Sequence, residues 1–236
     1  MPEPHDPPLY PAHRPISVAQ AREADRRATA EFSIPGLVLM EHAARGLAAL
    51  VAELAPATRS GPVVVICGPG QNGGDGLGAA RFLHSYGLEV DVVRLGSRPY
   101  RGDAAIEFAA LSREIDVPAL ISMPDVDAWV RSRLSRAGVV VDALFGVGLD
   151  RPLDEIARAI VLAINASSAV VVAVDVPSGL DADTGEPNPV AIEADVTAAM
   201  GFVKQGCVKP LGSRFCGRLV EVDIGLPLAV HGPYRA

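Results

Sequence analysis

Short β-branched runs alternate with longer helical patterns through the middle of this 236-residue sequence. The runs predict buried strands at residues 62–67, 88–95, 117–121, 138–146 and 169–177. Between them, apolar periodicity predicts helices at 73–87, 100–115, 124–137 and 153–167. Such alternation is typical of βαβ units, whose right-handed crossovers place helices on both faces of a parallel sheet. Two more strands are expected at 194–202 and 218–225, so the chain is predicted to form one α/β domain with a mostly parallel sheet.

Two helices are expected ahead of the first strand. Ser17 and Gln20 form a capping-box pattern, which predicts a helix over residues 16–32. A second helix is expected at 33–56, where apolar residues recur at intervals of three and four: Leu37, Met40, Ala44, Leu47, Val51 and Leu54. Packing in the core is the simplest explanation of this stripe, and a homodimer interface is the alternative.

The chain is expected to hold a single domain between two tails. Residues 1–15 are rich in proline and polar groups, which favours a flexible tail. No internal repeat or linker divides the region after them, so residues 16–228 are predicted to be one domain and 229–236 a C-terminal tail. Three cysteines without a C-x-x-C pair indicate a reducing compartment, and the sequence shows no secretory signal, so a cytoplasmic location is expected.

Charge and hydropathy exclude two classes of partner. The net charge is −7, whereas nucleic-acid-binding domains usually carry a basic patch. Arg22, Arg26 and Arg27 recur at helical spacing and are expected on solvated helix faces. No apolar run approaches the length that spans a bilayer. A nucleic-acid partner and a membrane partner are therefore not expected.

Chemically active groups gather where predicted strands end. The first strand runs into "CGPGQNGGDG" (residues 67–76), the fourth carries Asp142, and the fifth carries Asp175. In an open parallel sheet, ligands bind outside the carboxyl ends of the strands. A single aspartate at such a place commonly caps the next helix or turn. Two of them, each followed shortly by glycine, favour a shared crevice.

The glycine-rich segment raises the possibility of a dinucleotide site. Gly68, Gly70 and Gly73 have the G-x-G-x-x-G spacing between a predicted strand and a predicted helix. A dinucleotide site would also place an acid after the second strand, where the sequence offers only Arg94 and Arg98. Asp75 would moreover repel a phosphate at close range. The segment therefore favours hydroxyl groups or a cation over a pyrophosphate.

An amide, a carboxylate and a hydroxyl near these strand ends form a set of hard oxygen ligands. They belong to Asn72, Asp142 and Ser178. Such a set suits neither zinc nor copper. A single carboxylate is few for a divalent ion, so a monovalent cation with backbone carbonyls completing its shell is the better match.

Four long motifs in order resemble a known family. They are "VICGPGQNGGDGLGAARFL", "VVDALFGVGLDRPL", "VAVDVPSGLDADTGE" and "ADVTAAMGFVKQG", preceded by "LMEHAARGLA". Their order and spacing resemble the YjeF N-terminal domain, the NAD(P)H-hydrate epimerase family. The resemblance implies a Rossmann-like three-layer αβα sandwich. It also implies interconversion of the R and S forms of NADHX and NADPHX, which are hydrates of the reduced nicotinamide cofactors, in partnership with a NAD(P)H-hydrate dehydratase.

The resemblance also implies roles for individual residues. It places one substrate loop at Gln71, Asn72, Gly73, Gly74 and Asp75 and a second at Gly146, Val147, Gly148, Leu149, Asp150, Arg151 and Pro152. It makes Asp175 a substrate contact and assigns a potassium ion to Asn72, Asp142 and Ser178. Departures from the usual family pattern occur at Gln71, His42 and Ala44, where the family usually has Asn, Asn and Gly. Lys204 matches a frequent family lysine, whose role stays open.

Epimerisation requires the C–O bond or the ring C–N bond at the hydroxyl-bearing carbon to break and re-form. Either route requires a proton to be given and returned, which a carboxylic acid in the crevice can do. Asp175 is the expected acid–base group and Asp75 the second candidate. A non-catalytic dimerising scaffold and an NAD(P)-dependent oxidoreductase are the alternatives, and the missing acid after the second strand weighs against the latter.

Overall fold

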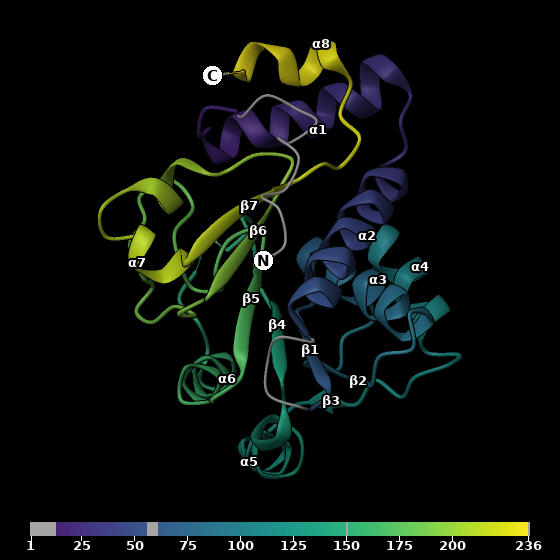
Figure 1. Ribbon diagram of the computed structural model, residues 1–236, viewed down its shortest axis with the longest axis vertical. Coiled ribbons are helices and arrows are strands. Elements are labelled where there is room, and N and C mark those ends of the chain that lie inside the picture. The colour runs from purple at the N-terminus through teal and green to yellow at the C-terminus, as the bar shows by residue number, and fades with distance from the viewer. Residues whose placement is uncertain (1–12, 56–60, 150, 236) are drawn as a thin grey trace, which may run out of the picture.

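The computed structural model describes residues 13–55, 61–149 and 151–235. In these residues, seven strands form a single parallel sheet in the order β3-β2-β1-β4-β5-β6-β7 (Figure 1). Every pair of neighbouring strands is parallel. The strands are β1 (Val63–Cys67), β2 (Val90–Leu95), β3 (Ala119–Leu120), β4 (Val139–Ala143), β5 (Val170–Val174), β6 (Val196–Met200) and β7 (Arg218–Val222). The predicted strands are all confirmed, although β3 is reduced to two residues.

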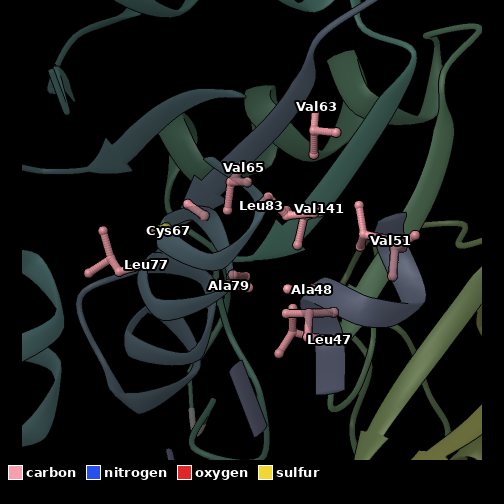
Figure 2. Close-up of a cluster of buried hydrophobic side chains, with 14 of the residues drawn as sticks. Leu47, Ala48, Val51, Val63, Val65, Cys67, Leu77, Ala79, Leu83 and Val141 are labelled. Atoms are coloured by element: carbon pink, nitrogen blue, oxygen red, sulfur yellow. The ribbon is translucent and has the colours of Figure 1, made fainter. Parts of the chain in front are cut away.

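Helices cover both faces of the sheet, which confirms the αβα sandwich. The helices are α1 (Val18–Phe32), α2 (Gly36–Leu54), α3 (Gln71–Ser85), α4 (Asp103–Leu111), α5 (Met123–Ser132), α6 (Glu155–Asn165), α7 (Ser213–Cys216) and α8 (Leu228–His231). Alternate residues of β1 point to opposite layers, as strand geometry requires. Val63 and Val65 pack with α2, α3 and α4 (Figure 2), whereas Val64 and Ile66 pack with α5 and α6.

The apolar stripe of α2 lies in the core of its own chain. Ala44, Leu47 and Val51 are fully buried, and Figure 2 shows Leu47 and Val51 beside the side chains of β1 and α3. The approach of α2 to α3 depends on Gly78, because a Cβ there would lie 2.7 Å from the Cβ of Ala44. The core-packing interpretation of the stripe is therefore confirmed, and the stripe itself no longer argues for a homodimer.

The two ends of the described chain pack against each other, next to the carboxyl end of β6. Ser17 caps α1 through the predicted capping box with Gln20. Residues 229–235 were expected to be a tail, but most of them belong to α8 and a following turn, and Val230 is fully buried against α1. Figure 1 shows α8 beside α1. The burial of one apolar side chain explains this difference from the expectation. Of the expected N-terminal tail, residues 1–12 lie outside the described residues.

Candidate active site

A cavity of about 740 Å³ lies at the carboxyl ends of the central strands. The strand order reverses between β1 and β4, and a crevice forms at such a switch point in open parallel sheets. Its walls come from α1, the first turns of α2 and α3, the loop after β4, and the segments after β5 and β6. The crevice predicted from the strand ends is therefore present, and it has the size of a small-molecule site.

The glycines that begin α3 serve packing rather than access for a ligand. A Cβ on Gly68 would lie 1.7 Å from the carbonyl oxygen of Leu144, and one on Gly73 would lie 1.9 Å from the carbonyl oxygen of Gly68. A Cβ on Gly76 would lie 2.4 Å from the Cβ of Ala143. These glycines let the helix begin directly against β1 and β4. Gly73 and Gly74, expected in the substrate loop, face the interior and do not line the cavity.

The helix also starts earlier than the sequence predicted. It begins at Gln71 instead of residue 73, so Gln71 and Asn72 stand in its first turn and Asp75 in its second. All three line the cavity. The carboxyl group of Asp75 has no hydrogen-bond partner among the described residues. Burial raises its pKa well above the ordinary value, and the neighbouring charge of Asp175 raises it further. Both effects favour the protonated acid.

Asp175 follows β5 directly and is paired with a buried lysine. Its backbone has a φ of +68°, a left-handed conformation that is uncommon outside glycine and is often found at functional sites. Lys204 is almost fully buried, and its Nζ donates to Asp175 Oδ1 and to the carbonyl oxygens of Met200 and Phe202, at 2.9 and 2.8 Å. The other oxygen, Asp175 Oδ2, is directed towards the Cα of Gly146. The lysine thus fixes one carboxylate oxygen and leaves the second beside the loop after β4.

Asp142 and Ser178 form a separate, fully buried pair behind the cavity. Ser178 donates its backbone N–H to Asp142 Oδ2 at 2.8 Å and its hydroxyl to Oδ1 at 2.6 Å. The backbone N–H of Phe145 donates to Ser178 Oγ at 2.8 Å. Burial raises the pKa of Asp142 to about 6, although these hydrogen bonds favour the carboxylate. The pair joins the ends of β4 and β5 and shapes the loop that follows β4.

The oxygen ligands suggested by the sequence lie around this loop. Asn72 Oδ1 stands close to the Cα of Gly146, while Asn72 Nδ2 is buried and has no hydrogen-bond partner among the described residues. Phe145 lies between Gly146 and the pair formed by Asp142 and Ser178, and its carbonyl oxygen approaches Ser178 Oγ at 3.0 Å. Amide, carboxylate, hydroxyl and carbonyl oxygens from α3, β4 and the segments after β4 and β5 thus lie around one loop. This donor chemistry fits a hard monovalent cation.

The second expected substrate loop lines the cavity through most of its length. Gly146, Val147, Gly148, Leu149 and Arg151 contribute to the wall, whereas Pro152 does not. Asp150 lies outside the described residues. Of the family departures, Gln71 lines the cavity. His42 is exposed beside Ile224, and Ala44 is buried between α2 and α3.

Sequence reasoning missed the contribution of α1. Arg22 is exposed, as expected, but it also lines the cavity and donates from Nη2 to the carbonyl oxygen of Val147 at 3.1 Å. Asp25 lines the same wall. A polar residue on an amphipathic helix looks the same in sequence whether it faces solvent or a cavity, so no sequence signal separates these two residues from the rest of the helix.

Comparison with known proteins places this site in a family. A model of the family described as YjeF-related protein N-terminus matches residues 36–206. The chain belongs to this family. It is 38% identical over 215 residues to the NAD(P)H-hydrate epimerase of Rhodopirellula baltica, covering 91% of this chain and 85% of that one. It is 35% identical over 208 residues to the NAD(P)H-hydrate epimerase of Limosilactobacillus fermentum, covering 88% and 95%.

Other YjeF-family relatives are longer, and one solved structure shares the fold. The bifunctional NAD(P)H-hydrate repair enzyme Nnr of Thermofilum pendens is 38% identical over 217 residues, which are 90% of this chain and 40% of that protein. The crystal structure of yeast ynu0 has a TM-score of 0.72 at 25% identity, covering 88% of this chain and 87% of that one. The Rossmann-like fold implied by the resemblance is thus confirmed. In the described part of the chain, none of the helices is long and apolar enough to cross a bilayer.

Proposed function

We propose that this protein interconverts the R and S forms of NADHX and NADPHX. Relatives named NAD(P)H-hydrate epimerase align over most of both chains, which supports the assignment. The observation that carries it is the pair of aspartates in the cavity. Asp75 is held in an environment that favours the neutral acid, whereas Asp175 is paired with the buried cation of Lys204. Two carboxyl groups in such different surroundings suit proton exchange with a hydroxyl group.

The roles of the two aspartates follow from their surroundings. Lys204 stabilises the negative charge of Asp175 and leaves Oδ2 beside Gly146, so this oxygen accepts a proton from substrate or water. Asp75, protonated and without a hydrogen-bond partner among the described residues, donates one. We assign the catalytic roles to Asp175 and Asp75. The first turn of α3, with Gln71 and Asn72, and the loop residues Gly146, Val147 and Arg151 position the substrate beside these two carboxyl groups.

We further propose that Asn72, Asp142 and Ser178 hold a potassium ion. When bound, such an ion would fix the loop after β4 and offset the charge of Asp142. The amide oxygen of Asn72 beside Gly146, and the carbonyl oxygen of Phe145 next to Ser178, support a cation at this place. Replacing potassium with a bulky organic cation is expected to lower both the epimerisation rate and the melting temperature. Equal values in the two salts would remove the ion from the account.

A dehydratase that acts on the same hydrates is the proposed functional partner. This chain covers only 40% of the bifunctional repair enzyme of Thermofilum pendens, so a further segment accompanies the matching part in that protein. A homodimer in the cytoplasm stays a prediction. Sedimentation at micromolar concentrations tests the dimer.

Turnover separates the proposed epimerase from the alternatives. The protein is supplied with one epimer of NADHX and with a stereospecific dehydratase that consumes the other. An epimerase lets the dehydratase consume the whole sample, whereas a scaffold leaves the first epimer untouched. An oxidoreductase would instead transfer hydride from intact NADPH. Failure of the sample to be consumed, with the dehydratase active on its own epimer, would contradict the proposal.

A further inference from the structure

The first helix forms a wall of the cavity and lies outside the segment that the family model matches. The match begins at residue 36, whereas α1 spans Val18–Phe32. Ala21, Asp25 and Thr29 line the cavity, and their spacing of four places them along one face of the helix. Ala24 and Ala28 are buried on the adjoining face. This orientation directs Asp25 into the site.

Contacts at the start of α1 and in its second turn fix the helix over the cavity. Ile16 donates its N–H to the carbonyl oxygen of Val203 at 3.0 Å, and its own carbonyl accepts from the N–H of Gln205 at 2.8 Å. These bonds flank Lys204, so the entry to α1 is tied to the lysine that holds Asp175. In the second turn of α1, Arg22 donates a hydrogen bond to the carbonyl oxygen of Val147 in the loop after β4. Asp25 therefore has a defined position relative to both.

The carboxyl group of Asp25 is available for chemistry. It is open to the cavity and has no hydrogen-bond partner among the residues that the structure describes. Charged and titratable groups line the cavity around it from several elements: Asp75 from α3, Asp175 and Lys204 after the strand ends, Asp103 from α4, Arg151 from the loop after β4, and Arg22 from its own helix. Confinement within these walls raises the pKa of Asp25 to about 6, and Lys204 opposes this shift. Both protonation states are thus accessible near neutral pH.

We propose that Asp25 is a further catalytic acid–base group, which acts on one face of the nicotinamide ring while Asp175 and Asp75 act on the other. Inversion at a single carbon through C–O cleavage requires proton exchange on both faces of a planar ring. Asp25 comes from the α1 wall, and the other two aspartates come from the strand ends and α3. The inference rests on the proposed epimerase function and adds a group that acts on the second face of the nicotinamide ring.

The inversion needs no oxidant or reductant, because water leaves and water is added back. A carboxylic acid on one wall gives its proton to the ring hydroxyl, and the C–O bond breaks so that water leaves. The lone pair of the ring nitrogen forms a C=N bond, which leaves a planar cation. A second water adds its oxygen to the opposite face, and the carboxylate on that wall takes the surplus proton. The two walls exchange roles in the reverse direction, as microscopic reversibility requires.

Replacement of the carboxyl group tests this role. Asp25→Asn in the full chain is expected to lower kcat in both directions by about 100-fold or more, with a smaller change in KM. The inflection near pH 6 in the parent's rate profile should disappear. Glu23→Gln is the matched control, because Glu23 lies on the exposed face of the same helix and pairs with Arg26. Should Asp25→Asn not fold, Asp25→Ser takes the same measurements.

The outcomes separate this inference from the proposed function. A folded Asp25 variant with a parental kcat, or with a change in KM alone, would overturn the catalytic role while the parent still epimerises. A parent that does not epimerise would overturn the proposed function itself. In water enriched in ¹⁸O, the parent should place the label in every inverted product molecule. Inverted product that keeps its original oxygen would overturn the two-face route.

Discussion

Four aspartates lie at the carboxyl end of the same sheet: Asp142 is buried behind the cavity, and the other three line it. They differ in the hydrogen bonds that their carboxyl oxygens accept. Asp142 has both oxygens hydrogen-bonded by Ser178 and is fully buried. In the cavity, the carboxyl groups of Asp25 and Asp75 have no hydrogen-bond partner among the described residues, and Asp175 has one carboxyl oxygen held by Lys204. Asp142 resembles a structural element, whereas the cavity aspartates each keep a carboxyl oxygen without a hydrogen bond from the described residues.

The difference teaches which feature of a carboxylate indicates chemistry. Location at the carboxyl end of the sheet is common to Asp142 and the cavity aspartates and does not separate them. A buried carboxylate whose two oxygens both accept hydrogen bonds from the protein stabilises the backbone that it binds. A carboxyl group that faces a cavity without partners keeps its capacity to bind substrate and to change protonation state. Four substitutions test the distinction between a structural carboxylate and one that faces the cavity.

The largest effect is expected from Asp175→Asn. The amide retains the shape of the side chain but cannot accept a proton as the carboxylate does, so kcat should fall by about 100- to 10,000-fold. The melting temperature should change far less. Asp127→Asn, on the exposed surface of α5, is the matched control. A folded variant with the parental kcat would remove Asp175 from the mechanism.

Loss of the lysine that faces Asp175 should act on stability as well as rate. Lys204→Met removes a buried cation and leaves the Asp175 carboxylate without its partner. We expect a loss of about 2–4 kcal/mol in the free energy of unfolding, because the variant leaves a buried charge without its cation. The open side of Asp175, whose second oxygen reaches the cavity, limits this loss. Urea unfolding measures it. Adding Asp175→Asn should restore part of the loss, and strictly additive losses would show that the two side chains are not coupled.

The buried Asp142 should reveal itself in the pH dependence of stability. Its pKa rises from 3.8 unfolded to about 6 folded, so its contribution is present below pH 4 and is lost as the pH rises to 6. That loss is on the order of 2–3 kcal/mol in a buffer without potassium. Asp142→Asn should lack this part of the pH dependence in thermal unfolding. Parallel curves for parent and variant would contradict the assigned burial cost.

The smallest effect is expected from Ser178→Ala. The variant loses the hydroxyl that bonds Asp142 and leaves the N–H of Phe145 without its acceptor. A loss of about 1–2 kcal/mol in the free energy of unfolding follows from these unmade hydrogen bonds. Thr197→Val is the matched control, as it removes another buried hydroxyl, which donates to the carbonyl of Cys216. If Ser178→Ala unfolds at the parental urea concentration, the pair is not structural.

The fold and part of the site could be predicted because their signals are local. Strand and helix periods differ, so the alternation predicted the parallel sheet, and the sheet then placed Asp142 and Asp175 at one edge. Asp75 was expected near the cavity because its segment follows the end of the first strand, and its charge argued against a phosphate ligand there. These inferences need no knowledge of which residues meet across the fold.

Other features depend on contacts between distant segments, which spacing does not reveal. The G-x-G-x-x-G pattern does not show that carbonyl oxygens of Leu144 and Gly68 fill the space beside the glycines. Lys204 binds an aspartate 29 residues earlier. Asp25 lies on a helix that is indistinguishable in sequence from a solvated one. Such roles appear only when the segments are brought together.

A progress curve that resolves the two epimers tests the central claim most directly. Pure R-NADHX is incubated with the parent protein or with Asp175→Asn, and the R and S forms are separated chromatographically over time. We expect the parent to bring the mixture rapidly to the equilibrium ratio of R and S forms. The variant should interconvert them at a rate close to that in buffer alone. A parent no faster than buffer, or a folded variant as fast as the parent, would contradict the claim that these cavity carboxyl groups carry out the reaction.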